Sequence, residues 1–190
     1  MSIYDICVCM GRFQPFHWGH FDLVQTALTH GKQVIVLLGS HLSSPSLKNP
    51  WCSEEREQMI RMCLESSWQE RIQVVSICDR KTDEEWATDI YQKVYALAHP
   101  HSRISIVGHH DNGKEFFSQR LPHWDYIEKL RRPGINATAI RTVYFSQSPE
   151  IDYALKIPFG TLQYLRDFKQ QPIYQHLCQE FISEQSNTSF

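Results

Sequence analysis

Two histidines three residues apart, His17 and His20, lie between a short apolar segment and the first helical pattern of the chain. The first turn of a helix has N–H groups without partners inside the helix, and the helix dipole strengthens their attraction for an anion. Gly19 lets the backbone come close to a ligand, and Arg12 supplies a planar guanidinium that matches phosphate oxygens. Together these residues predict a binding site for a phosphorylated ligand.

The histidine pair also has two simpler explanations. An isolated pair at this spacing more often caps or packs a helix, but the Gly11-Arg12 lead-in and the strand–loop–helix position favour phosphate binding. A zinc site is disfavoured because no third ligand or general-base glutamate accompanies the pair. The six cysteines are scattered, with no CxxC pair beside matching histidines. We therefore expect free thiols in a reducing cytoplasm.

The elements that would position this turn alternate along the chain. Strands are predicted over residues 3–10, 33–39, 72–78 and 103–107, and helices over 20–30, from 53 onward and over 83–98. Parallel strands need crossover connections, so this order predicts an α/β fold with a Rossmann-like open parallel sheet and helices on both faces. Its ligand crevice would lie at the carboxyl ends of the strands. The GxGxxG dinucleotide fingerprint is absent from the first turn.

The pattern becomes looser after Gly108. Aromatic residues through Trp124 and Tyr126 indicate a further strand. Helices are predicted over 138–145, 148–155, 158–168 and 172–185, the last two opened by proline. We expect one domain over residues 1–155 and a C-terminal helical extension over 156–190 that packs on the same domain.

The composition excludes several classes of protein. A hydrophobic content of 42% is enough for a core. A formal net charge of -2 and a pI near 6.5 give no field that attracts a polyanion, so no nucleic-acid partner is expected. The chain has no charged leader before a long apolar stretch, and no run approaches about 18 apolar residues. We therefore expect neither secretion nor a membrane span.

Residues 11–20, GRFQPFHWGH, resemble the HxGH signature of the nucleotidyltransferase superfamily. In its longer form the segment resembles the archaeal-type nicotinamide-nucleotide (NMN) adenylyltransferases, including the adenylyltransferase domain of bacterial fusions with a Nudix hydrolase. Residues 135–141, INATAIR, are similar to the ISxTxxR signature of that family. Asn136 replaces the usual serine and keeps a polar helix cap.

The resemblance implies roles for individual residues. It implies catalytic roles for His17, His20 and Arg141. Contacts with ATP and its phosphates are implied for Gly11, Arg12, Phe13, Gly19, Lys48, Gly108, Thr138 and Ile140. Contacts with NMN are implied for Phe13, Asn49, Trp86 and Asp111.

Several of these residues have a plainer explanation beside the functional one. Lys48 opens a Lys-Asn-Pro-Trp segment similar to the family's basic-Asn-Pro-aromatic loop, yet an exposed lysine is usually only a solvated charge. Packing in the core is an equal alternative for Trp86, whose ring would otherwise stack on the cationic nicotinamide. The segment Gly108-His-His-Asp111 resembles the family's Gly-His-Lys-Lys-Asp region but lacks its lysines.

The resemblance implies the reaction ATP + NMN → NAD + diphosphate, as part of NAD biosynthesis. The phosphate oxygen of NMN would attack the α-phosphorus of ATP in line, and no general base is needed because the nucleophile is already an anion. The protein would position the substrates and neutralise charge. Mg²⁺ would enter bound to the ATP phosphates, with no protein ligands of its own.

Other functions compete with this one. Phosphopantetheine adenylyltransferases and polyol-phosphate cytidylyltransferases share HxGH, but they should not share the long motif, the Asn-Pro-aromatic loop and Trp86 together. A non-catalytic regulator that binds ATP or NAD is a rival from another class. No Nudix motif occurs in the chain, so ADP-ribose hydrolysis is not expected. The sequence leaves open the acid or amide form of the mononucleotide, and related enzymes often form homo-oligomers.

Overall fold

The computed structural model describes residues 3–41, 45–109 and 113–187. The chain forms two compact units. We call the first the sheet unit; it comprises Met1–Arg12, Gly19–Leu42 and Glu65–Arg132. We call the second the helical unit; it comprises Phe13–Trp18, Ser43–Leu64 and Pro133–Phe190. These units follow different boundaries from the expected division at residue 155, which stays a prediction.

The sheet unit contains a parallel sheet with the strand order β3-β2-β1-β4-β5. The strands are β1 (Tyr4–Gly11), β2 (Gly31–Leu38), β3 (Ile72–Ser76), β4 (Ile104–His109) and β5 (Asp125–Lys129). The chain runs outward from β1 through β2 to β3, then returns to the other side of β1 for β4 and β5. The carboxyl ends of β1 and β4 therefore form the switch point at which such sheets bind ligands.

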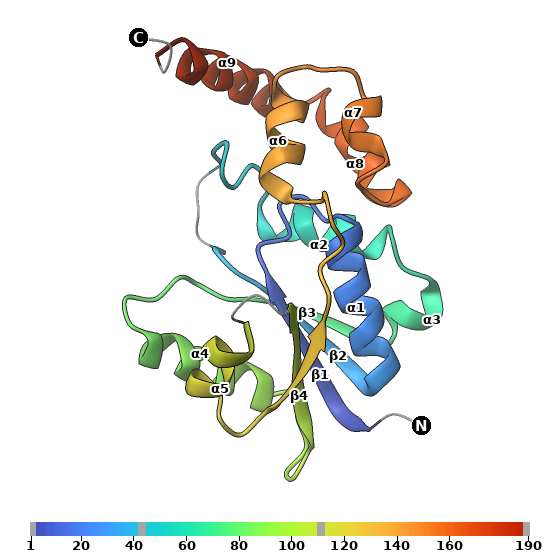
Figure 1. Cartoon of the computed structure of the whole chain (residues 1–190), viewed down its shortest axis with the longest axis vertical. Helices are drawn as coiled ribbons and strands as arrows, with labels where there is room; N and C mark the ends of the chain where they lie inside the picture. Colours follow the sequence, from blue (N-terminus) through green and yellow to red (C-terminus); the bar gives the residue numbers. More distant parts are fainter. Residues whose placement is uncertain (1–2, 42–44, 110–112, 188–190) are drawn as a thin grey trace. The chain divides into compact units, whose positions relative to one another are not determined.

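Helices cover both faces of this sheet (Figure 1). The helices of the unit are α1 (Trp18–His30), α3 (Ser66–Gln69), α4 (Asp83–Tyr95) and α5 (Gly113–Arg120). Side chains alternate along β1: Ile6 and Val8 join the core beneath α4, whereas the Cys9 thiol on the opposite face donates to the Leu23 carbonyl of α1. This burial on both sides explains the continuous apolar runs in the sequence.

The helical unit is built around an aromatic cluster. Its helices are α2 (Ser53–Arg61), α6 (Ala137–Phe145), α7 (Ile151–Ala154), α8 (Phe159–Phe168) and α9 (Pro172–Asn187). Trp51 is 2% exposed; its ring stacks on Phe145 at 6.1 Å between centroids and meets Phe168 edge-on at 5.7 Å. No helix within the described ranges is long and apolar enough to cross a membrane.

Most predicted elements are confirmed, with differences after Gly108. The aromatic stretch is not one strand: Phe116 and Phe117 belong to α5, and only Asp125–Lys129 forms β5. Here tertiary packing of the aromatic rings against α4 outweighs the strand propensity of these residues. The helix expected from residue 148 begins at Ile151, and the short α3 was not anticipated.

Gly160→Ala tests a close approach between α8 and the end of α2 in the helical unit. A Cβ at Gly160, in α8, would lie 2.3 Å from the carbonyl oxygen of Met62, which caps α2. Because that neighbour is backbone, a helix must shift. We expect urea denaturation to give a free energy of unfolding lower by about 1–3 kcal/mol.

Gly39→Ala is the matched control. The nearest heavy atom to its added Cβ is 3.8 Å away, an ordinary contact. The free energy of unfolding should change by no more than about 0.5 kcal/mol. Equal stability of the two variants would show that α2 and α8 are not packed this closely.

Candidate functional site

Glycines lie at the carboxyl edge of the sheet, within the sheet unit. Gly11 ends β1, and its carbonyl accepts a hydrogen bond from the N–H of Gly39 at 3.0 Å. Gly108 follows Val107, which pairs with Cys9 of β1. Arg12 comes directly after Gly11 and approaches Gly39 on the same edge. The structure therefore brings three of the predicted residues, Gly11, Arg12 and Gly108, to the switch point of the sheet.

Gly39 and Ser40 were not selected from the sequence but belong to this edge. Ser40 has a positive φ of 56° and is 9% exposed, and its hydroxyl donates to Asp79 Oδ1 at 3.3 Å. A left-handed serine indicates a backbone conformation held by its surroundings. The signal available in the sequence was a Gly-Ser pair closing the second apolar run.

In the helical unit, Arg141 of α6 is 6% exposed and bonds to two backbone segments. Its Nη1 donates to the Gln14 carbonyl at 2.6 Å and its Nε to the Leu47 carbonyl at 2.9 Å. A third nitrogen, Nη2, donates to Thr138 Oγ1 at 3.2 Å. Arg141 thus links two of the predicted motifs directly. It belongs to the 135–141 segment, and Gln14 belongs to the 11–20 turn.

The segment that Arg141 holds is tightly packed. Gln14 bonds through its side chain to both the N–H and the carbonyl of Trp51, at 3.1 and 2.7 Å. Phe13 has a positive φ of 53° and is only 1% exposed, and its ring lies 6.1 Å from that of Phe16. The Phe13 side chain is therefore part of a core. A φ of this sign in a bulky residue is costly and is typical of functional sites.

The two histidines occupy the start of α1. His17 immediately precedes the helix and is 7% exposed, whereas His20 is half-buried at the third helical position. The N–H of Trp18 donates to the Lys156 carbonyl at 3.2 Å. His20 therefore lies in the first turn, where the helix dipole favours an anion. This agrees with the predicted strand–turn–helix context.

The loop before α2 carries Lys48 and Asn49. Lys48 is exposed, and Asn49 forms a turn with Ser46 through bonds of 3.2 Å in both directions. Asn49 Oδ1 is buried and has no hydrogen-bond partner among the described residues. Such an acceptor is costly unless a donor reaches it. Further along this loop, partial desolvation raises the pKa of the Cys52 thiol to about 11, which disfavours the reactive thiolate at neutral pH.

Asn136 caps α6 as its sequence position predicts. Its side-chain oxygen accepts from the Ala139 N–H at 2.7 Å. Thr138 is exposed in the first turn, whereas Ile140 is fully buried and its N–H already bonds to the Asn136 carbonyl. A contact of Ile140 with ATP stays a prediction.

Trp86 lies in the first turn of α4 and packs against α5. Its ring stacks on Phe117, with an interplanar angle of 27° and centroids 6.3 Å apart, and meets Phe116 edge-on at 5.6 Å. The half-buried Trp86 thus packs against the core of the sheet unit, as expected if its role is structural. The contact of Trp86 with a ligand stays a prediction. Asp111, for which a contact with NMN was also implied, lies outside the described residues.

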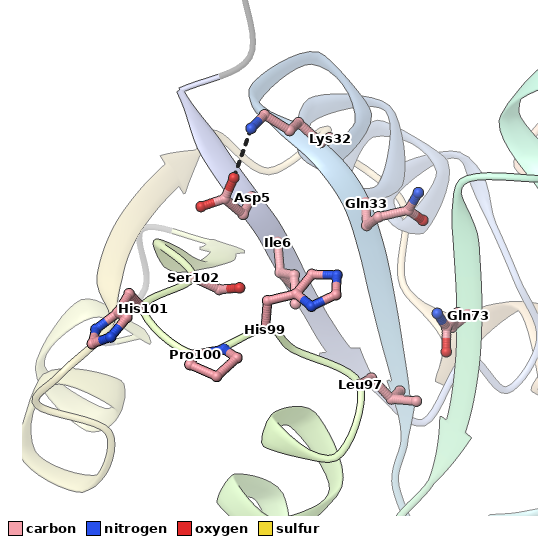
Figure 2. A pocket seen from close by; sticks show the side chains of 10 residues that line it. All are labelled: Asp5, Ile6, Lys32, Gln33, Gln73, Leu97, His99, Pro100, His101 and Ser102. Atoms are coloured by element: carbon pink, nitrogen blue, oxygen red, sulfur yellow. Dashed lines mark hydrogen bonds and ion pairs between the residues drawn. The ribbon is translucent and has the colours of Figure 1, made fainter.

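A cavity of about 620 Å³ lies elsewhere, at the amino edge of the sheet (Figure 2). An ion pair of 2.8 Å between Asp5 and Lys32 closes one side of it. The cavity is lined by Asp5, Ile6, Lys32, Gln33, Gln73, Leu97, His99, Pro100, His101 and Ser102. None of these is a motif residue, so cavity size and sequence motifs indicate opposite edges of the sheet. Parallel sheets bind ligands at their carboxyl edge, so the candidate site lies with the motif residues and not at this cavity.

Comparison with known proteins shows the family to which the chain belongs. Residues 8–143 match the model of the cytidylyltransferase-like family. The chain is 32% identical over 188 residues to a nicotinamide/nicotinic acid mononucleotide adenylyltransferase of Acinetobacter baylyi, covering 98% of each chain. It is 26% identical to nicotinamide-nucleotide adenylyltransferase 1 of Sulfolobus acidocaldarius, covering 84% of this chain and 87% of the relative.

A solved structure from Francisella tularensis has a similar fold. It is a bifunctional NMN adenylyltransferase/ADP ribose pyrophosphatase complexed with AMP and a manganese ion, with 29% identity and a TM-score of 0.86. The match covers 97% of this chain but only 55% of the Francisella chain. The Rossmann-like sheet and the HxGH turn agree with these matches. The chain therefore belongs to the cytidylyltransferase-like nucleotidyltransferases and is a homologue of the mononucleotide adenylyltransferases.

Proposed function

We propose that this chain catalyses ATP + NMN → NAD + diphosphate. The observation that carries the proposal is the GRFQPFHWGH turn at the switch point of the sheet, in a chain that matches the Acinetobacter adenylyltransferase along 98% of its length. Phosphopantetheine or polyol-phosphate substrates have no comparable support. The name of the Acinetobacter relative includes both the amide and the acid mononucleotide. We therefore propose that both are accepted.

The proposed chemistry is a direct phosphoryl substitution. An oxygen of the mononucleotide phosphate forms a bond to the α-phosphorus of ATP, and the bond from that phosphorus to the bridging oxygen of the β-phosphate breaks. The bridging oxygen leaves with diphosphate, so no proton has to be removed from the nucleophile. His17, His20, Arg12 and Lys48 would donate hydrogen bonds or positive charge to the phosphates as charge shifts to the leaving group.

A divalent metal ion is part of the proposal, with Mg²⁺ as the natural partner of ATP. The Francisella relative was solved with AMP and manganese, which supports a divalent ion. Among the described residues, no group of three or more His, Cys, Asp or Glu could hold a metal. We propose that Mg²⁺ arrives on the triphosphate and keeps mostly phosphate and water ligands.

Arg141 would have two roles: it would position other phosphate-binding residues, and its positive charge would act on the nucleotide directly. Its bonds to the Gln14 and Leu47 carbonyls fix the segment that leads to His17 and the loop that carries Lys48. We therefore propose that Arg141 sets the positions of these groups and adds positive charge near the phosphates. The buried Asn49 Oδ1 acceptor is a suitable partner for an amide N–H of the nicotinamide.

The proposed setting is the cytoplasm. All six cysteines are free, three of them buried, which is usual in a reducing compartment. The substrates are small molecules, and we propose no nucleic-acid or membrane partner. A homo-oligomer and a C-terminal extension over 156–190 remain part of the proposal.

The experiment that tests the proposed function measures diphosphate release from ATP and Mg²⁺. NMN, its acid analogue and phosphopantetheine are compared as acceptors, with His20→Ala run beside the wild type. We expect release with both pyridine mononucleotides and none with phosphopantetheine. The His20→Ala variant should lose at least about 100-fold in kcat, as when a transition-state donor is removed. If the protein bound ATP but released no diphosphate with any acceptor, the proposed catalytic activity would be refuted. The protein would then be a nucleotide-binding regulator.

Arg141→Lys tests whether Arg141 holds the protein together. Lysine keeps the charge but has one nitrogen, so it cannot replace the donors to both carbonyls. A buried carbonyl without a donor costs about 1–3 kcal/mol. We expect the free energy of unfolding without nucleotide to fall by about that amount, and kcat/KM to fall as well.

The comparison variant is Lys48→Ala, which removes an exposed cation. We expect it to raise KM for ATP and to leave the free energy of unfolding unchanged. If Arg141→Lys were also as stable as the wild type in the absence of nucleotide, the positioning role of Arg141 would be wrong.

A further inference from the structure

Tyr126 of β5 occupies space that two glycines leave open. A Cβ added at Gly108 would lie 2.3 Å from Tyr126 Oη and 2.9 Å from its Cζ, and one added at Gly113 would lie 2.5 Å from the same Oη. Neither glycine has a positive φ, so the backbone itself does not require glycine at either position. Gly108 near the end of β4 and Gly113 at the start of α5 are therefore explained by the tyrosine between them.

The Tyr126 hydroxyl also holds the end of β4. It donates to the carbonyl of His109, the last residue of β4, at 2.7 Å. The His109 ring is held in addition, because its Nδ1 lies 3.2 Å from the Lys129 carbonyl at the end of β5. The last residue of β4 is thus fixed by β5 through both its backbone and its side chain. It lies at the carboxyl edge of the sheet, one strand from Gly11.

An aromatic stack connects Tyr126 to Trp86. The Tyr126 ring stacks on Phe117 with an interplanar angle of 25° and a centroid distance of 6.1 Å. Phe117 stacks in turn on Trp86 at 27° and 6.3 Å. An ion pair between Arg120 and Asp83 further ties α5 to α4. The position of Tyr126 therefore constrains the plane of the Trp86 ring as well as the end of β4.

We infer that Tyr126 is a positioning residue for the mononucleotide. It fixes the His109 end of β4 through its hydroxyl and orients Trp86 through Phe117, without touching substrate itself. The inference rests on the proposed function and on the contact with the mononucleotide that the family resemblance implies for Trp86; the His109 end of β4 lies at the same carboxyl edge of the sheet as Gly11. A tyrosine that only packs the core would change stability and leave the substrate constants alone.

Tyr126→Phe separates these two roles, because it removes the hydroxyl and keeps the ring. We expect KM for the mononucleotide to rise about five- to tenfold, the factor that one hydrogen bond is worth. KM for ATP and kcat should each change by less than about twofold. Unchanged KM for the mononucleotide in a folded, active variant would overturn the inference.

The matched control is Tyr174→Phe in the helical unit. Tyr174 is buried, and its hydroxyl likewise donates to a backbone carbonyl, that of Tyr144, at 3.3 Å. We expect a similar or smaller loss of thermal stability and no change in either KM. An equal rise of KM for the mononucleotide in both variants would mean that a general loosening, and not Tyr126, raises KM.

Alanine substitutions at the two glycines give a second, independent readout. With the Tyr126 hydroxyl removed, the nearest remaining neighbour of a Cβ at Gly113 is Cζ at 3.5 Å, an ordinary contact. At Gly108, Cζ remains at 2.9 Å. Tyr126→Phe should therefore rescue Gly113→Ala, so that the double variant has the KM of Tyr126→Phe alone. It should not rescue Gly108→Ala. Additive effects at Gly113 would overturn the inference.

The wild type distinguishes failure of this inference from failure of the proposed function. Diphosphate release by the wild type, together with Tyr126→Phe that behaves identically, refutes the positioning role alone. No release by the wild type with any mononucleotide refutes both.

Discussion

The buried guanidinium of Arg141 joins segments that are 94 and 127 residues distant in the sequence. It does so with directed bonds to backbone carbonyls, which are groups that must find donors once they are buried. The Gln14 carbonyl belongs to the turn before His17, and the Leu47 carbonyl belongs to the loop of Lys48. Within the helical unit, one side chain therefore holds both of these segments. Removing that side chain would disturb the geometry of the site and the stability of the unit together.

The sheet unit meets a different constraint. A parallel sheet with β1 at its centre brings the ends of β1, β2 and β4 to one edge, where Gly11, Gly39 and Gly108 follow or end the strands. These glycines do not have a common cause. Gly39 would tolerate a Cβ in the protein as it stands, whereas Gly108 would not, because Tyr126 fills the space. Of these two glycines, Gly39 is the one whose presence a ligand could explain.

The sequence predicted the sheet well because each buried strand appears as an apolar run and each crossover helix has its own periodicity. It also predicted the Asn136 cap, which is a local interaction. It did not predict α5, because Phe116 and Phe117 form a helix only where their rings can pack on Trp86. Local sequence patterns do not predict contacts between distant segments. The bonds of Arg141 and the packing of Tyr126 against two glycines are contacts of this kind.

The proposed reaction transfers the adenylyl group of ATP, its α-phosphoryl group with the nucleoside, in one direct substitution. The most direct measurement follows the reaction with NMN and ATP of known configuration at an isotopically labelled, sulfur-substituted α-phosphorus. We expect the label to appear in the dinucleotide with inverted configuration, since one in-line attack inverts the configuration at phosphorus. Retention of configuration would require a covalent intermediate. Label remaining in ADP while the γ-phosphate is transferred would identify a kinase, and either result would contradict direct adenylyl transfer.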